Sequence, residues 1–225
     1  MTSTPSSGVR TAMAERARIR RFSRVERAAH WLVAVTTLVM TVSGLALYLP
    51  DLADYVARPL TKQVHLGAAI ALGAGLLALM LVGNRRELRR TASQLDRFDR
   101  ADREWLVGGP ARVVARHPSP PQGRFNAGQK LNAALSAGLL VVLAVTGTLL
   151  WLGERDTRFR LDGSVLVHDW ASLLLGLLVL GHTYLAVLHP TTRHALRGMT
   201  TGEVDREWAR KHHSTWVSEE ETAGR

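Results

Sequence analysis

Apolar residues gather in four blocks along the chain, and polar, arginine-rich segments separate these blocks. Each block is long enough to cross a hydrocarbon core of ~30 Å, which needs about 20 residues at a helical rise of about 1.5 Å. The pattern therefore predicts an all-α fold, an integral membrane four-helix bundle. The expected spans are residues 30–49, 64–82, 131–152 and 164–188.

The polar segments predict how the chain is organised around these spans. Residues 1–27 are expected to form a cytoplasmic N-terminal segment, residues 28–189 the transmembrane domain, and residues 190–225 a cytoplasmic tail. The domain includes a long polar stretch, residues 84–130, which is interpreted as a cytoplasmic loop. No internal repeat is expected.

Within this long stretch, Gly108 to Pro110 and the run Pro118 to Pro121 are expected to break regular structure. Trp105 and Leu106, with Val113 and Val114 beyond the first break, could instead lie on the membrane surface as a short interfacial helix. A solvated loop with a few docking residues is an equal alternative.

The distribution of basic residues predicts the orientation. The two short loops, residues 50–63 and 153–163, carry only five of the 29 lysines and arginines. Lysine and arginine collect on the cytoplasmic side of membrane proteins. Both termini and the middle loop are therefore expected in the cytoplasm, with the protein in the plasma (inner) membrane. This topology explains the net charge of +10 without nucleic-acid binding.

The chain contains no cysteine, which excludes disulfides, zinc–thiolate sites and iron–sulfur clusters held by this chain. Any redox chemistry therefore needs a cofactor that is held by other side chains. Nine histidines are the candidates.

Four of the histidines lie in or at the ends of three of the spans, where a polar ring nitrogen is costly and suggests function. His168 and His182 are ~21 Å apart along one helix and ~40° from one face, so that helix can serve two sites. Depth then pairs His65 with His168 on the outer side and His30 with His182 on the inner side. A lone histidine could equally form a packing hydrogen bond, but two facing imidazoles suit a six-coordinate haem iron. The four positions predict two b-type haems.

Three further histidines are interpreted differently. His189 follows His182 by seven residues and lies on nearly the same face, but it stands at the membrane boundary beside Pro190. His182 is therefore the preferred inner ligand. His212 and His213 lie on a polar tail, where packing or a solvated pair is favoured over a metal site.

Several short strings resemble the di-haem cytochrome b (gamma) subunit of membrane-bound respiratory formate dehydrogenase. They are residues 21–27 leading into His30-Trp31, the string Phe125-Asn126-Ala127-Gly128-Gln129-Lys130, the His168/His182 spacing, and the tail segments 198–204 and 208–216. The resemblance extends from about residue 20 to residue 216 and departs in the arginine-rich middle loop. The haem-ligand positions of that family match the four histidines paired above.

The resemblance also implies a quinone pocket that includes Asn126, Gly128 and Gln129, with menaquinone or ubiquinone as substrate. The same residues have a purely structural interpretation, because Asn126 followed by Gln129 is a capping-box pattern at a helix start. The two roles are compatible.

The family further implies two partner subunits. An iron–sulfur (beta) subunit on the periplasmic side would feed electrons to this chain, and a molybdenum or tungsten (alpha) subunit would oxidise formate. This chain would then carry out no formate chemistry itself, and the complex would serve anaerobic respiration; a higher oligomer of the complex is left open. The alternatives are a cytochrome b subunit of a hydrogenase or thiosulfate reductase, and a haem-free membrane anchor or transporter.

Overall fold

The computed structural model describes residues 17–49, 55, 57–115 and 120–223. Most of the expected N-terminal segment, the expected helix stop at Pro50 and Asp51, and part of the proline run lie outside the described residues. The chain divides into two units, which we call the span unit and the polar unit. The span unit comprises residues 25–88 and 135–182; the polar unit comprises residues 1–24, 89–134 and 183–225.

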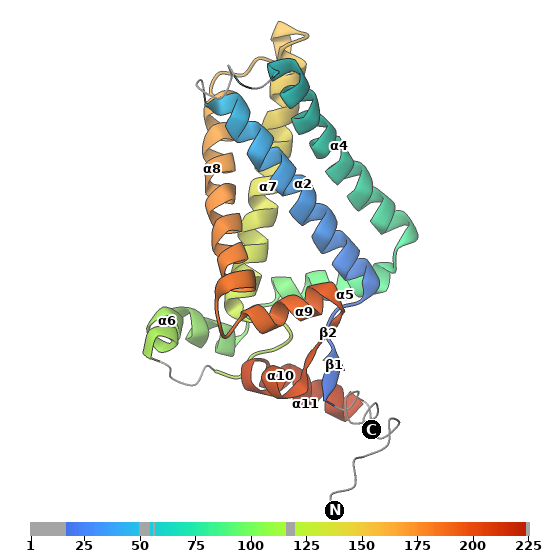
Figure 1. Cartoon of the computed structure of the whole chain (residues 1–225), viewed down its shortest axis with the longest axis vertical. Coiled ribbons are helices and arrows are strands. Elements are labelled where there is room, and N and C mark those ends of the chain that lie inside the picture. Colours follow the sequence, from blue (N-terminus) through green and yellow to red (C-terminus); the bar gives the residue numbers. More distant parts are fainter. Residues whose placement is uncertain (1–16, 50–54, 56, 116–119, 224–225) are drawn as a thin grey trace, which may run out of the picture. The chain divides into compact units, whose positions relative to one another are not determined.

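Four helices are long and apolar enough to cross a membrane (Figure 1), as the sequence predicts. They have 25 to 27 residues each and a mean hydropathy of 1.8 to 2.2, so each is ~37–40 Å long. The four-span, mainly α-helical expectation is confirmed, while the side of each terminus stays a prediction. The helices are α2 (Arg24–Tyr48), α4 (Arg58–Val82), α7 (Ala127–Gly153) and α8 (Ser164–Thr183), which continues as the π-helical segment η2 (Tyr184–Leu188).

The first two helices begin earlier than the apolar pattern predicts. Helix α2 starts at Arg24 instead of His30, and α4 starts at Arg58 instead of Val64. Apolar residues mark only the part of a helix that lies in hydrocarbon, whereas a polar first turn can stand in the headgroup region. Pro59 lies in the first turn of α4, where its missing N–H removes no helical hydrogen bond.

The long polar stretch folds as two helices, α5 (Arg85–Asp96) and α6 (Arg100–Ala115), so the solvated-loop alternative is wrong. Asp99 starts α6: its Oδ1 accepts from the Asp102 N–H at 2.8 Å, and Asp102 Oδ2 accepts from the Asp99 N–H at 3.0 Å. The expected break at Gly108 to Pro110 is also wrong, because α6 continues through it. A proline removes a single backbone donor, and a helix that is capped at its start can retain its other hydrogen bonds.

The tail is a folded part of the polar unit. Strand β1 (Arg18–Arg20) pairs antiparallel with β2 (Glu203–Asp205), and Ile19 stands opposite Val204. This ribbon corrects the purely α-helical expectation; a strand of three residues is too short to show an alternating pattern. The remaining elements are η1 (Thr157–Phe159) of the span unit, and η3 (Arg193–Ala195), α9 (Leu196–Thr200), α10 (Arg206–His212) and α11 (Ser214–Ala223) of the tail.

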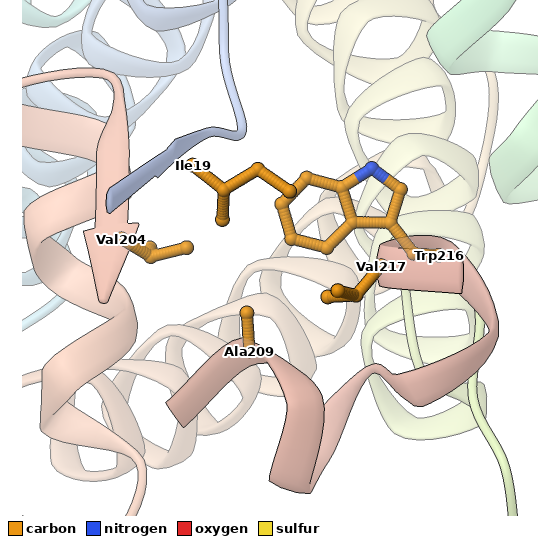
Figure 2. Close-up of a cluster of buried hydrophobic side chains, with 5 residues drawn as sticks. All are labelled: Ile19, Val204, Ala209, Trp216 and Val217. Carbon is orange, nitrogen blue, oxygen red and sulfur yellow. The ribbon is translucent and has the colours of Figure 1, made fainter. Parts of the chain in front are cut away.

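A small apolar core joins the two strands to α10 and α11 (Figure 2). Its members are at most 9% exposed, and the indole of Trp216 is the largest side chain among them. The tail is therefore held to the N-terminal strand by burial of apolar surface. The core residues are Ile19, Val204, Ala209, Trp216 and Val217.

The two halves of the chain repeat one another, contrary to the sequence-based expectation. In the polar unit Arg21-Phe22 recurs as Arg124-Phe125, an offset of 103 residues. The two arginines exchange hydrogen bonds: Arg21 Nη2 donates to the Arg124 carbonyl at 2.7 Å, and Arg124 Nε donates to the Arg21 carbonyl at 2.9 Å. The two phenylalanine rings lie 5.9 Å apart between their centres.

The span unit carries the same repeat. Ser43-Gly44 in α2 precedes His65 in α4 just as Thr146-Gly147 in α7 precedes His168 in α8; the hydroxyl residue stands 22 positions ahead of the histidine in both cases. These matches stand among aliphatic residues that any membrane span would share, which hides them in the sequence. The hairpins α2–α4 and α7–α8 are thus two copies of one motif.

Candidate functional site

The structure brings His65 of α4 together with His168 of α8, inside the span unit. Their ring centres are 6.4 Å apart and the ring planes are inclined by 63°. Both rings are half-buried. Desolvated ring nitrogens that face each other in an apolar bundle are available as ligands.

A second pair forms between His30 of α2 and His182 of α8, with ring centres 6.1 Å apart and an interplanar angle of 63°. Trp31 lies edge-on to His30, with their ring centres 5.6 Å apart. The structure therefore joins the same two pairs of histidines that depth along the helices predicts. Helix α8 contributes one histidine to each pair, two sites that lie ~21 Å apart along its axis.

The separation within each pair suits one metal ion between two imidazoles. A metal–nitrogen bond is about 2 Å long and an imidazole centre lies about 1 Å behind its nitrogen, so opposite ligands have ring centres about 6 Å apart. The observed 6.1 and 6.4 Å match this spacing. A direct hydrogen bond between two imidazoles has a similar separation, so the fit needs a second observation.

Two glycines supply that observation. A Cβ on Gly44 or on Gly147 would stand 3.3 Å from Cε1 of His65 or His168, respectively. Both positions are tight, and a side chain at either would displace the imidazole. The helices α2 and α7 are therefore shaped to the histidine rings, and the residues present fit a haem iron held by His65 and His168.

Other glycines of α4 differ in their surroundings. Gly75 packs against the side chain of Leu32, and a Cβ there would come within 2.6 Å of Leu32 Cδ2. Gly67 and Gly73 have no such neighbour within 4 Å. Close helix packing therefore explains Gly75, and open space lies beside the other two.

His189 belongs to the polar unit and is engaged by its own turn. Its Nδ1 lies 3.1 Å from the hydroxyl of Thr192 and 3.2 Å from that of Thr191. Its ring centre lies 6.0 Å from that of Tyr184, the first residue of η2. The π-helical turn and the two threonines thus hold His189 in a local cluster.

The side chains of Asn126 and Gln129 form the capping box that their spacing predicts. Asn126 Oδ1 accepts from the Gln129 N–H at 2.9 Å, and Gln129 Oε1 accepts from the Asn126 N–H at 3.1 Å. Arg21 Nη2 donates to the same Gln129 oxygen at 3.3 Å. These contacts occupy the amide oxygens, and the two NH₂ groups remain as donors.

Gly128 is covered by an aromatic ring. A Cβ at this glycine would stand 2.9 Å from Cη2 of Trp105, a residue of α6. The missing side chain therefore allows Trp105 to pack on the first turn of α7, which the sequence pattern did not reveal. Lys130 makes a second link to α6: its ammonium donates to Asp102 Oδ2 at 2.5 Å, and both side chains are at most 9% exposed.

Arg21 lies at the centre of the polar unit and is almost fully buried. Its guanidinium stacks near Phe22, Trp208 and Trp216. Burial and the nearby charge of Arg124 lower the pKa of Arg21 to about 9. The contacts of Arg21 therefore lie within the polar unit itself.

His213 packs beside the same aromatic residues. Its Nδ1–H donates to the Gly123 carbonyl at 2.7 Å, and its ring lies between those of Trp208 and Trp216. Burial, followed by the charge of Arg21, holds the pKa of His213 well below its usual range. His212 stacks on Trp208, with the ring centres 4.8 Å apart. The expected packing role of these two histidines is confirmed.

Known proteins resemble the chain over nearly its full length. The sequence profile of the family described as prokaryotic cytochrome b561 matches residues 21–202. The cytochrome b556(Fdn) subunit of nitrate-inducible formate dehydrogenase from Escherichia coli K12 is 27% identical over 207 residues, which cover 88% of this chain and 90% of that protein. The residues that match the family profile, 21–202, include all four paired histidines and the Phe125 to Lys130 string.

Two other relatives have similar names. The cytochrome b556(fdo) subunit of formate dehydrogenase from E. coli K12 is 25% identical over 92% of this chain and 95% of its own length. The formate dehydrogenase cytochrome b556 subunit of Haemophilus influenzae is 24% identical over 90% of this chain and 84% of its own length.

Proposed function

We propose that this chain, which belongs to the prokaryotic cytochrome b561 family, is the membrane electron-transfer subunit of a respiratory formate dehydrogenase. The names of the relatives from E. coli and H. influenzae support formate over hydrogen as the electron donor, and a formate dehydrogenase over a thiosulfate reductase, where thiosulfate would accept the electrons. Formate oxidation itself would belong to a molybdenum or tungsten subunit, with an iron–sulfur subunit between the two. This chain would receive electrons and pass them to quinone.

The observation that carries the proposal is the presence of two histidine pairs at metal-bridging distance, 6.1 and 6.4 Å between ring centres. His30 and His182 would hold one b-type haem, and His65 and His168 the other. A haem with both axial positions filled carries one electron and leaves no site for oxygen. Helix α8 would link the two haems, because it contributes a ligand to each pair.

The proposal is tested on the complex purified from the membrane. A reduced-minus-oxidised visible spectrum and a pyridine haemochrome assay should give two b haems per chain. A haem-free anchor or transporter would show no such bands, and that result would overturn the proposed function. Formate should reduce both haems in the intact complex; reduction by hydrogen instead, or oxidation of the reduced haems by thiosulfate, would reassign the substrate of the partner enzyme.

We further propose that both termini face the cytoplasm of an inner-membrane protein. Residues 1–27, 84–130 and 190–225 together carry 24 of the 29 lysines and arginines, in keeping with the positive-inside pattern. Reporter fusions after Pro50, Gly83, Gly153 and the last residue should read outside, inside, outside and inside. A periplasmic C-terminus would reverse the proposed direction of electron flow.

Quinone, menaquinone or ubiquinone, is proposed to bind at Asn126, Gly128 and Gln129. The capping box uses the amide oxygens of Asn126 and Gln129, so the two NH₂ groups are the donors left for a quinone carbonyl. Because Trp105 covers Gly128, the ring would approach through the amides instead of through the glycine.

Alanine at Asn126 or Gln129 would also remove the helix cap, so matched variants are needed. Asn126→Ser and Gln129→Glu keep an acceptor oxygen for the capping box and lose the amide donors. Quinone reduction should slow in both, while formate still reduces both haems through the partner subunits. Unchanged quinone kinetics in the double variant would place the quinone elsewhere.

A further inference from the structure

The two histidines of the His65–His168 pair each contact a hydroxyl group on a neighbouring helix. Ser43 Oγ of α2 lies 3.0 Å from His65 Nδ1, and Thr146 Oγ1 of α7 lies 2.8 Å from His168 Nδ1. The contacts occupy equivalent positions of the internal repeat, and each joins the two helices of one hairpin. Serine fills the position in one copy and threonine in the other, so the hydroxyl is the shared feature.

Each hydroxyl uses its own hydrogen elsewhere. Ser43 Oγ donates to the Val39 carbonyl at 2.7 Å, and Thr146 Oγ1 donates to the Val142 carbonyl at 2.8 Å. A hydroxyl has one hydrogen and two lone pairs, so its oxygen is left to accept from the imidazole. The proton of each ring therefore lies on Nδ1, and Nε2 presents a lone pair.

This tautomer is the one that a metal-binding histidine needs when iron is on Nε2. An Nδ1–H group that donates to an oxygen fixes the ring orientation and makes the imidazole a stronger donor. Gly44 and Gly147, next in sequence to the two hydroxyl residues, leave room for Cε1 of the same rings. Ser43-Gly44 and Thr146-Gly147 thus contact the rings of His65 and His168, respectively, in the same way.

The second histidine pair differs. Among the described residues, the rings of His30 and His182 have no hydroxyl partner. In the other copy of the repeat, Ala133 stands in the place of His30, and Leu79 in the place of His182. His65 and His168 therefore occupy equivalent positions in the two copies of the repeat, whereas His30 and His182 do not. Any effect of the hydroxyls should be confined to the His65–His168 pair.

We propose that Ser43 and Thr146 are positioning residues that lower the reduction potential of the haem held by His65 and His168. This inference rests on the proposed haem-binding function. A more basic imidazole stabilises ferric over ferrous iron, so these hydrogen bonds favour the oxidised state. The hydrogen bonds thus make the His65–His168 haem more reducing than it would be without them, which favours electron transfer towards the His30–His182 haem.

The test is a redox titration of the purified complex, followed by visible spectroscopy. Thr146→Val removes the hydroxyl with little change of shape, and Ser43→Ala does the same in the other copy. Loss of an outer-shell partner costs a metal site about 10- to 100-fold in metal affinity or activity. We expect a shift of the ferric-to-ferrous ratio at the lower end of this scale; a tenfold shift corresponds to a potential about 59 mV more positive for one electron. Both variants should shift the potential of the same haem in the same direction, because Ser43 and Thr146 occupy equivalent positions of the repeat.

Controls come from the same helices. Within the described part of the chain, the hydroxyls of Thr41 and Thr148 bond only to their own helix, at the Thr37 and Ala144 carbonyls, so Thr41→Val and Thr148→Val should leave both potentials unchanged. The exchanges Ser43→Thr and Thr146→Ser, each found in the other copy of the repeat, should keep the wild-type potential.

The outcomes separate this inference from the proposed function. A positive shift of one haem potential, with the other unchanged, supports it; no shift, or an equal shift of both haems, overturns it while haem binding stands. If Thr146→Val fails to load one haem, recovery of haem and potential in Thr146→Ser supports the proposal, and failure to recover overturns it. A wild-type complex without haem would overturn the proposed function itself.

Discussion

The span unit and the polar unit hold their important side chains in different ways. In the span unit the buried apolar residues are mainly small, such as Ala68 and Ala171, and two of the four paired histidines, His65 and His168, each contact a hydroxyl group. In the polar unit the fully buried side chains include large ones, Trp216 and His213, and charges are buried with them. Lipid is as apolar as leucine, so helices in a bilayer gain little from burying large apolar side chains, whereas a unit in contact with water depends on it.

The difference teaches where each unit should be sensitive to substitution. Single polar atoms should decide function in the span unit with little effect on folding. In the polar unit, loss of a buried partner should cost stability while the chemistry of the histidine pairs remains. Four experiments, taken from the largest expected effect to the smallest, test this contrast.

The largest effect is expected at the histidine pairs. His65→Ala or His168→Ala should abolish the haem of that pair and leave the other haem partly loaded, because an apolar side chain supplies no iron ligand. His189→Ala should leave both haems in place, since its ring is held by threonines of its own turn. Haem content per chain is the measurement. Loss of a haem in His189→Ala with retention in His182→Ala would show that the inner ligand is misassigned.

The buried ion pair of the polar unit should give the next largest effect. Asp102→Asn keeps an acceptor for the Asp99 N–H but leaves the Lys130 ammonium buried without a counter-charge. Breaking such a pair costs about 3–5 kcal/mol. Chemical denaturation in detergent, with limited proteolysis of residues 89–134, measures the loss. The double variant Asp102→Asn/Lys130→Met should recover most of it, and a deficit that persists would mean that the charge is not the cause.

A smaller, pH-dependent effect is expected at His213. Its folded-state pKa lies below the unfolded value because of burial and the charge of Arg21, so the folded state binds fewer protons. The contribution of neutral His213 to the free energy of unfolding is fully present above the unfolded-state pKa of about 6.5. Below that pH, the free energy of unfolding falls by up to about 1.4 kcal/mol for each pH unit until the folded-state pKa is reached. Hydrogen exchange of residues 203–217 from pH 8 to pH 5 should show progressive loss of protection. His213→Gln, which stays neutral, should flatten this dependence; an equally steep profile would point to another group.

The smallest effect should come from the ion pair between Lys62 and Glu154, which links the start of α4 to the end of α7 within the span unit. Both side chains are about half exposed, at 50% and 51%. Exposed pairs contribute about 0–1 kcal/mol, and salt screens them. Lys62→Ala should change thermal stability and haem content very little. A loss comparable to that of Asp102→Asn would show that this pair is shielded from water in the membrane.

The depth of each histidine could be predicted because it depends only on helical rise and on the order of the spans. The pairing of His65 with His168 and of His30 with His182 followed from that rise and from the direction of each span. The capping box at Asn126 was also predictable, since its two residues are three positions apart. Such contacts lie within one helix or follow from its length.

Contacts that depend on how separate segments pack were not predictable. The ring of Trp105 on Gly128, the hydrogen bonds between Arg21 and Arg124, and the core around Trp216 join residues far apart in sequence. A polar tail with scattered tryptophans gives no periodic signal that would reveal a core. The internal repeat was present in the sequence, but it was recognised only from the equivalent contacts that its matching residues make in the structure.

The sequence by itself determined the four spans, the absence of thiol ligands and the depth at which each histidine stands. These properties depend on composition and on the fixed rise of a helix. Only the tertiary structure decided which nitrogen of His65 and His168 carries the proton, because that depends on a hydroxyl of another helix at 3.0 or 2.8 Å. Helix rotation and register set such distances, and many side chains fix them jointly.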